Sequence, residues 1–163
     1  MSRDMAAAPA AAKAVVEEHR EFVSITVANQ LFGIPVLQVQ DVLSPQRITR
    51  IPLAPPEVAG SLNLRGRIVT AIDIRVRLRL PPRPDGKQAM SVVVDHGGEL
   101  YSLLVDSVGE VLSLSASDAE RNPATLDPIW REVSAGIYRL DGNLLVVLDV
   151  AKVLDFSTRA AAA

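Results

Sequence analysis

The chain has 163 residues, a formal net charge of −2, no cysteine and 4% aromatic residues. The missing cysteines exclude disulfides, thiolate metal sites and cysteine nucleophiles, and the small net charge gives no general reason to expect nucleic acid or an anionic membrane as a partner. No apolar run reaches the roughly 20 residues of a membrane-spanning helix. Because short runs rich in valine and isoleucine are punctuated by proline and glycine, we expect a mostly β-structured protein.

The two ends of the chain differ in composition from the rest. Residues 1–20 are rich in alanine but carry Pro9, Lys13 and two adjacent glutamates, which argues against a secretory signal. We expect residues 1–20 and residues 157–163 to be flexible tails.

The first half of the chain predicts short strands joined by turns. In chain order the expected strands cover residues 21–29, 31–36, 47–51, 60–64 and 67–72. Residues 37–43 fit either one short helix or a bend in a strand. Asp73 follows the last strand and precedes an apolar stretch, so we expect its carboxylate to cap a short helix rather than to act in catalysis.

The second half of the chain repeats the first. Residues 30–43 align without a gap with residues 99–112, and residues 60–78 align with residues 136–154 in the same order. Two such blocks indicate a duplicated unit of about 65–75 residues. About five short strands in each unit favour a small barrel over a sandwich, because a closed barrel leaves no strand edge unpaired.

The division between the two units is expected at the stretch PPRPDGKQ, whose prolines stop strands and helices alike. This places the first unit at residues 21–82 and the second at residues 83–156.

The repeat also provides a comparison for one turn. Residues 63–73, NLRGRIVTAID, match residues 139–149, RLDGNLLVVLD, so that Arg65 corresponds to Asp141. Asp-Gly suits a type I′ hairpin turn, whereas arginine is unusual there. We therefore interpret Asp141 as the residue that the fold alone selects and Arg65 as a specialised replacement.

No pattern of residues typical of catalysis is present. The chain has no phosphate-binding glycine loop, no dinucleotide-binding glycine pattern, no H-E-x-x-H motif and no serine elbow. His19 and His96 are far apart in the sequence, and neither has another histidine at the spacing of metal ligands. We therefore expect that the protein is not an enzyme and that it has no catalytic residues, no cofactor and no metal site.

Arginines are concentrated in one part of the chain, where Asp73 is the one acidic residue. In one interpretation the alternating segment RVRLRL places these charges on a solvated face; in another they form a basic surface for an acidic partner, and nucleic acid would fit it. Because no aromatic residue lies between Phe32 and Tyr101 to stack on bases, a protein partner is the favoured interpretation and nucleic acid the alternative. The arginines are Arg65, Arg67, Arg75, Arg77, Arg79 and Arg83.

The segment ITRIPLAPPEVAGSLNLRGRIVTAIDIRVRL resembles the most characteristic region of the CheW-type chemotaxis coupling proteins. The N-L-R-G turn and the following D-I-R carry the resemblance, which extends over about residues 22–156. Thr70 and Ala71 depart from the family pattern, which has Pro-Val there, and Ser61 replaces an apolar residue. The resemblance implies an all-β fold of two packed five-stranded SH3-like β-barrel subdomains with short helical turns.

The resemblance also implies a function. Members of the family are non-catalytic adaptors of the cytoplasm, found at membrane-associated receptor arrays. They join the cytoplasmic tips of chemoreceptors to the regulatory domain of a CheA-type histidine kinase. For this chain we therefore expect those two partners, no nucleic acid and no direct insertion into the membrane.

Candidate binding residues follow from the resemblance, position by position. Alternative structural roles stay open for several of them: core packing for the three valines and backbone geometry for the two glycines. The residues implied to bind the receptor are Val39, Asp41, Gly60, Arg65, Gly66 and Ile68. Those implied to bind either the kinase or the receptor are Val108 and Val111.

Overall fold

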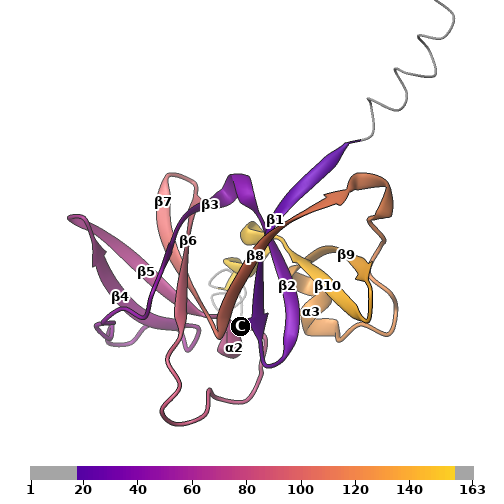
Figure 1. Cartoon of the computed structure of the whole chain (residues 1–163). Coiled ribbons are helices and arrows are strands. Elements are labelled where there is room, and N and C mark those ends of the chain that lie inside the picture. The colour runs from indigo at the N-terminus through magenta and orange to yellow at the C-terminus, as the bar shows by residue number, and fades with distance from the viewer. Residues whose placement is uncertain (1–17, 157–163) are drawn as a thin grey trace, which may run out of the picture.

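A computed structural model describes residues 18–156, which form ten strands in two five-stranded sheets with a few short helices. The two sheets lie side by side (Figure 1), and the expected all-β fold class is confirmed. Most of the two expected tails, residues 1–17 and 157–163, lies outside the described residues. His19 and Arg20, which we assigned to the first tail, instead begin strand β1.

The elements follow the predicted order in both halves. The first half contains β1 (His19–Val27), β2 (Gln30–Pro35), η1 (Val36–Gln38), β3 (Val39–Leu43), β4 (Val58–Leu64), β5 (Arg67–Asp73) and α2 (Ile74–Arg77). The second half contains β6 (Met90–His96), β7 (Glu99–Val105), β8 (Ser107–Ser115), η2 (Ala116–Asp118), α3 (Pro128–Val133), β9 (Ser134–Leu140), β10 (Asn143–Leu148) and α4 (Val150–Val153).

In the first half one predicted segment has one of its two expected forms, and one predicted strand is absent. Residues 37–43 form the bent-strand alternative, because a 3₁₀ turn runs directly into β3. The strand expected at residues 47–51 is wrong: only Thr49 there makes a bridge, to Ser61 of β4. Prolines on both sides of that stretch cannot donate ladder hydrogen bonds, which keeps it irregular.

Each sheet takes strands from both halves of the chain. Sheet A has the strand order β8-β1-β2-β10-β9, and sheet B has the order β3-β6-β7-β5-β4. Under the duplication β1 to β5 correspond to β6 to β10, so the two orders are the same with the halves exchanged. The first hairpin of each half is part of the sheet formed mainly by the other half. The two sheets therefore do not coincide with the expected units at residues 21–82 and 83–156, and that boundary is wrong for them.

The exchange occurs where the chain crosses between the sheets. Pro35 ends β2, and the next turn leads the chain to β3 in sheet B (Figure 1). Asp106 occupies the matching corner between β7 and β8. Parallel pairing of β2 with β10 and of β5 with β7 joins the halves within each sheet. The hairpins are thus fixed by long-range pairing and not by their neighbours in sequence.

A shared core lies between the two sheets. On β1 the alternate residues Val23 and Ile25 face this core, which also contains Val92 and Val94 of sheet B. Phe22, the residue before Val23, belongs to a smaller apolar cluster on the other face of sheet A. At Phe22 and Val23 both faces of β1 are thus covered by apolar clusters, and this explains why two apolar residues follow one another there. The two sheets are consequently packed as one body.

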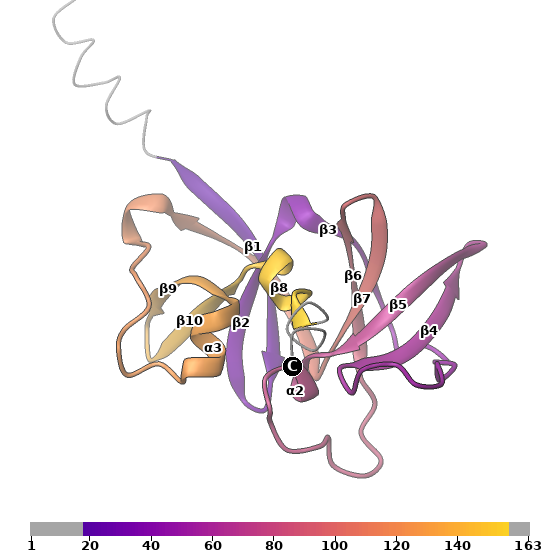
Figure 2. The ribbon, with the colours of Figure 1, turned by 180° about the vertical axis from the view of Figure 1, so that it is seen from behind.

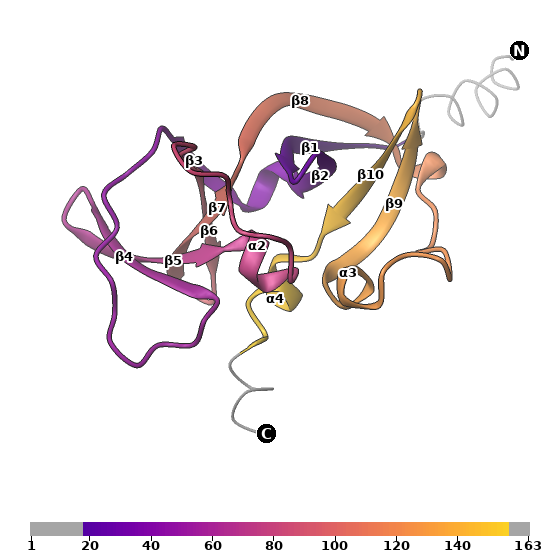
Figure 3. The same cartoon turned by 90° about the horizontal axis from the view of Figure 1, so that it is seen from below.

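Two short helices lie next to each other where the sheets meet, as seen from below in Figure 3. From behind, the last helical turns lie between the two sheets (Figure 2). Asp73 caps α2 by accepting a hydrogen bond from the Arg75 N–H at 2.9 Å, and Asp149 caps α4 by accepting from the Lys152 N–H at 3.2 Å. The predicted capping role of Asp73 is therefore confirmed.

Candidate functional site

The turn between β4 and β5 consists of Arg65 and Gly66. Both residues have positive φ, 51° for Arg65 and 84° for Gly66, whereas in the matching turn only Gly142 does and Asp141 does not. The signs typical of a type I′ turn therefore occur at Arg65, and our assignment of that turn type to Asp141 is wrong. Asn63 supports the unusual conformation, because its Oδ1 accepts a hydrogen bond from the Gly66 N–H at 3.0 Å.

Strand β3 brings Asp41 to this turn. Arg65 Nη2 lies 3.3 Å from Asp41 Oδ2, with 78% of the arginine side chain and 27% of the aspartate side chain exposed. The register of β3 shifts between Val39 and Asp41, and such a bulge re-aims the side chains that follow it. Because solvent screens the pair, it orients the guanidinium more than it stabilises the fold.

An apolar side chain completes this surface. Ile68, three residues after Arg65, is 70% exposed, and the space around the Cα of Gly66 is open. We call the group Asp41, Arg65, Gly66 and Ile68 the hairpin-tip site. It combines an ion pair with an exposed aliphatic side chain from the strand that follows the turn, which suits a protein surface with both polar and apolar groups.

Gly60, the fifth residue expected at the receptor surface, has a structural position. It is buried at a φ of 150°, and a Cβ on it would lie 2.2 Å from the Thr49 carbonyl oxygen. Gly136 repeats the arrangement in the second half, where a Cβ would lie 2.9 Å from the Glu120 oxygen. In both halves the glycine lets the preceding loop bridge to the strand, so the backbone alternative describes Gly60.

The three valines divide in a similar way. Val39 and Val108 occupy matching positions on β3 and β8, and both pack partly buried against the shared core. Val111 is 54% exposed and lies on β8 in sheet A, so it is available for contact. The structure therefore gives Val39 and Val108 the core-packing role that had remained an alternative.

The arginines between residues 65 and 83 do not form one basic surface. Arg75 donates to both carboxylate oxygens of Asp106, at 3.0 and 2.6 Å, and Arg83 donates to Asp106 at 2.9 Å. Arg77 is buried and donates to the carbonyl oxygens of Lys152 and Val153. Three of the six side chains therefore turn inward to acceptors, which contradicts both the solvated-face and the basic-surface interpretations for them.

Asp106 connects three parts of the molecule. Burial by itself raises the pKa of its carboxyl, but hydrogen bonds from Arg75, from the Ala28 N–H and from Arg83 lower that pKa to about 2. The carboxylate thereby joins the β1–β2 turn of sheet A to α2 and to the proline-rich linker. Sequence reasoning missed this cluster, because its partners Ala28 and Arg75 lie 78 and 31 residues away and leave no local pattern.

The described residues offer no centre for metal chemistry. Between residues 18 and 156 no three histidines, aspartates or glutamates are grouped so as to hold a metal ion. In the same range no helix is long and apolar enough to cross a membrane.

Known proteins share this architecture. Residues 21–157 match the family model described as a CheW-like domain. The chain is 31% identical over 135 residues to the chemotaxis protein CheW of Klebsiella aerogenes, covering 83% of this chain and 81% of that protein. It is 26% identical over 152 residues to the chemotaxis protein CheW of Rhizobium meliloti, covering 93% and 98%. The crystal structure of the scaffolding protein TtCheW from Thermoanaerobacter tengcongensis has a TM-score of 0.76 at 26% identity and covers 85% of this chain and 94% of that one.

The two five-stranded SH3-like barrels, together with these similarities, identify a scaffold protein of chemotaxis signalling. The chain belongs to the CheW-like family, whose members are non-catalytic scaffold or adaptor proteins. The resemblance found in the N-L-R-G segment and the expected fold class are thereby confirmed.

Proposed function

We propose that this chain couples the cytoplasmic tips of chemoreceptors to the regulatory domain of a CheA-type histidine kinase, at membrane-associated receptor arrays in the cytoplasm. Family membership supports the general role. The observation that carries the proposal is the conformation of Arg65, together with its ion pair to Asp41.

Arg65 is not required by the fold. The second half closes the matching hairpin with Asp141, which avoids positive φ, whereas Arg65 adopts a φ of 51° that non-glycine residues rarely adopt. Strained positions of this kind are concentrated at functional sites. Asp41 holds the guanidinium while most of it stays exposed, so the arginine is already oriented for an acidic or amide group on a partner.

An adaptor needs two surfaces that can be occupied together. The hairpin-tip site lies on sheet B, and we assign it to the receptor. Val111 is exposed on sheet A, and we assign it to contact with the kinase or a second part of the receptor. Gly60, Val39 and Val108 contribute to these surfaces indirectly, through the bridged loop and the shared core.

The test is reconstitution with the CheA-type kinase and receptor fragments from the same source. The unmodified chain is expected to bind both and to activate the kinase in the ternary complex. The Arg65→Glu variant is expected to keep its melting temperature and kinase binding but to lose receptor binding at least tenfold. Arg67→Glu, an exposed neighbour beside the turn, is the matched control. If Arg65→Glu assembles and activates like the unmodified chain, the receptor role of this site is wrong.

The nucleic-acid alternative has lost its main support. Arg75, Arg77 and Arg83 are engaged internally, which leaves Arg65, Arg67 and Arg79 as the exposed arginines of that segment. Three separated charges release few counterions, and we expect no gel shift with RNA or DNA even at low salt.

A further inference from the structure

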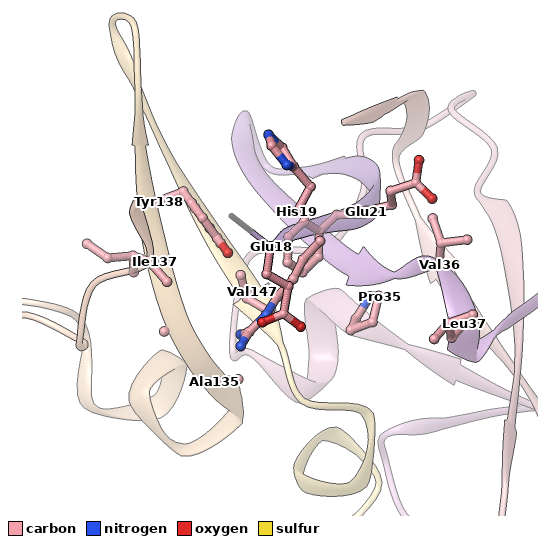
Figure 4. A pocket seen from close by; sticks show the side chains of 14 residues that line it. Glu18, His19, Glu21, Pro35, Val36, Leu37, Ala135, Ile137, Tyr138 and Val147 are labelled. Carbon is pink, nitrogen blue, oxygen red and sulfur yellow. The ribbon is translucent and has the colours of Figure 1, made fainter. Parts of the chain in front are cut away.

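A pocket of about 480 Å³ opens in sheet A, and none of the eight candidate binding residues lines it. The start of β1, the end of β2 with η1, and the start of β9 surround it (Figure 4). Leu37 stands at its rim with 95% of its surface exposed. Its apolar lining includes Phe22, Pro35, Val36, Ile137, Tyr138 and Val147.

A hydroxyl group without a partner lies in the wall of this pocket. Tyr138 is 2% exposed, and its hydroxyl forms no hydrogen bond. Figure 4 shows the hydroxyl directed away from β9, into the pocket towards the first residues of β1. Buried hydroxyls are usually hydrogen-bonded. The matching position in the other half is Leu62, so the fold can be built at this point without a hydroxyl.

The backbone beside the pocket is also incompletely paired. Strand β1 pairs with β8 from His19 onward, but with β2 only from Phe22 onward, because Pro35 ends β2 and η1 turns away. Residues 19–21 therefore have no neighbouring strand on the β2 side among the described residues. In sheet B the matching strand β6 is paired with β7 from its first residue, Met90. The unpaired edge is thus particular to sheet A.

We propose that this pocket, here called the β1 slot, binds an extended segment of a partner protein. The segment adds to β1 beside residues 19–21, places one aliphatic side chain against Phe22 and Val147, and accepts a hydrogen bond from the Tyr138 hydroxyl through a backbone carbonyl. An unpaired strand edge selects extended backbone, since a helix has satisfied its own backbone groups. The charges at the rim are mixed, Glu18 and Glu21 with Arg20, so shape and backbone pairing decide binding more than charge.

The two tyrosines of the chain make the slot observable. Biosynthetic labelling with 3-fluorotyrosine gives one fluorine NMR signal for Tyr138 and one for Tyr101, whose hydroxyl pairs with Glu99 at the surface and serves as the internal control. The probe is a blocked heptapeptide of alternating valine and threonine, added to the full chain at millimolar concentration. We expect a saturable shift of the Tyr138 signal, an unchanged Tyr101 signal and shifts of the amides of residues 19–21.

Two variants connect the signal to the slot. Tyr138→Phe removes only the hydroxyl. Because one hydrogen bond is lost, probe binding is expected to weaken about fivefold, as measured from the amide shifts. Ala135→Trp fills the pocket from an exposed lining position and is expected to abolish binding while the melting temperature stays within a few degrees.

Three results would overturn the proposal. The first is the absence of any Tyr138 shift with the extended probe. The second is an equal shift with a helical alanine-rich peptide, which would show that the slot does not select extended backbone. The third is binding only after removal of residues 1–17, which would assign the slot to this chain's own N-terminal segment. None of these measurements uses the receptor or the kinase, so they are independent of the proposed coupling function.

Discussion

Arg65 Nη2 lies 3.3 Å from Asp41 Oδ2, so the residue that the duplication marks as exceptional is held by a carboxylate from an edge strand of the same sheet. The two residues come from β3 and from the β4–β5 turn, which are at opposite ends of the strand order of sheet B. Their contact therefore depends on the curvature of that sheet, and it ties the orientation of Arg65 to the closed form of the barrel.

The ion pair predicts a graded response to substitution. Asp41→Asn removes the orienting charge but leaves Arg65 in place, so receptor affinity should fall less than with Arg65→Glu. Because the pair is largely solvated, either change should alter the free energy of unfolding by less than about 1 kcal/mol. Titration of both variants with a receptor fragment, beside denaturant unfolding, measures the two effects. If both variants lose the same affinity, the contribution of Arg65 to receptor binding depends entirely on its orientation by Asp41.

Gly60 and Gly66 are predicted to fail differently when changed to alanine. At Gly60 the new Cβ meets the Thr49 carbonyl oxygen, so we expect a destabilisation of about 3 kcal/mol or more and opening of the 49–61 bridge. At Gly66 the surroundings are open and only the positive φ opposes alanine, at a cost of about 1 kcal/mol. Urea unfolding measures both. If Gly60→Ala leaves the stability unchanged, the structural role of Gly60 is wrong and a role in receptor binding becomes the better interpretation.

Asp106 predicts a specific acid dependence of stability. Its pKa is about 2 in the folded protein against an ordinary value of 3.8, so its charged form stabilises the fold at every pH above about 4. That contribution, on the order of 2 kcal/mol, is lost as the pH falls from about 4 to about 2. Asp106→Asn should therefore be less stable at neutral pH, with the difference shrinking towards pH 2. Asp85→Asn, an exposed linker residue, is the control and should show no such pattern. A difference that is constant with pH would contradict the assignment.

Val108 and Val111 separate packing from binding on one strand. Val108 packs against the shared core, so Val108→Asp should lower stability by about 2 kcal/mol or more. Val111 is 54% exposed, so Val111→Asp should fold normally and lower affinity for a partner. Thermal unfolding combined with separate kinase and receptor binding assays distinguishes these outcomes. If Val111→Asp binds both partners normally, Val111 is only a surface residue.

Local patterns in the sequence predicted much of this structure. The strands, the hairpin at Arg65 and the Asp73 cap depend on residues within a few positions of one another, and the structure contains all of them except the strand expected at residues 47–51. The duplication likewise gave the correct order of elements in each half. Arg65, Gly66 and Asp41 do come together, because the hairpin and the curvature of the sheet fix their positions.

What sequence reasoning missed depends on distant contacts. Nothing in a strand pattern states which half its partner strand comes from, so the exchange of hairpins could not be seen. Arg75 and Arg77 were interpreted as charges on a solvated face or a basic surface, yet in the helical turn after Asp73 they meet acceptors from the second half. Tyr138 belongs to no motif in the sequence, and only the geometry around it revealed an unpartnered hydroxyl.

The exchange of hairpins bears on how such a protein could have arisen. A chain with a single unit would have one hairpin without a sheet to join, and two such chains would complete each other as a symmetric homodimer. Duplication and fusion through the proline-rich linker would turn that dimer into one polypeptide. The two copies would then be free to diverge, one keeping an aspartate at its hairpin tip and the other acquiring an arginine.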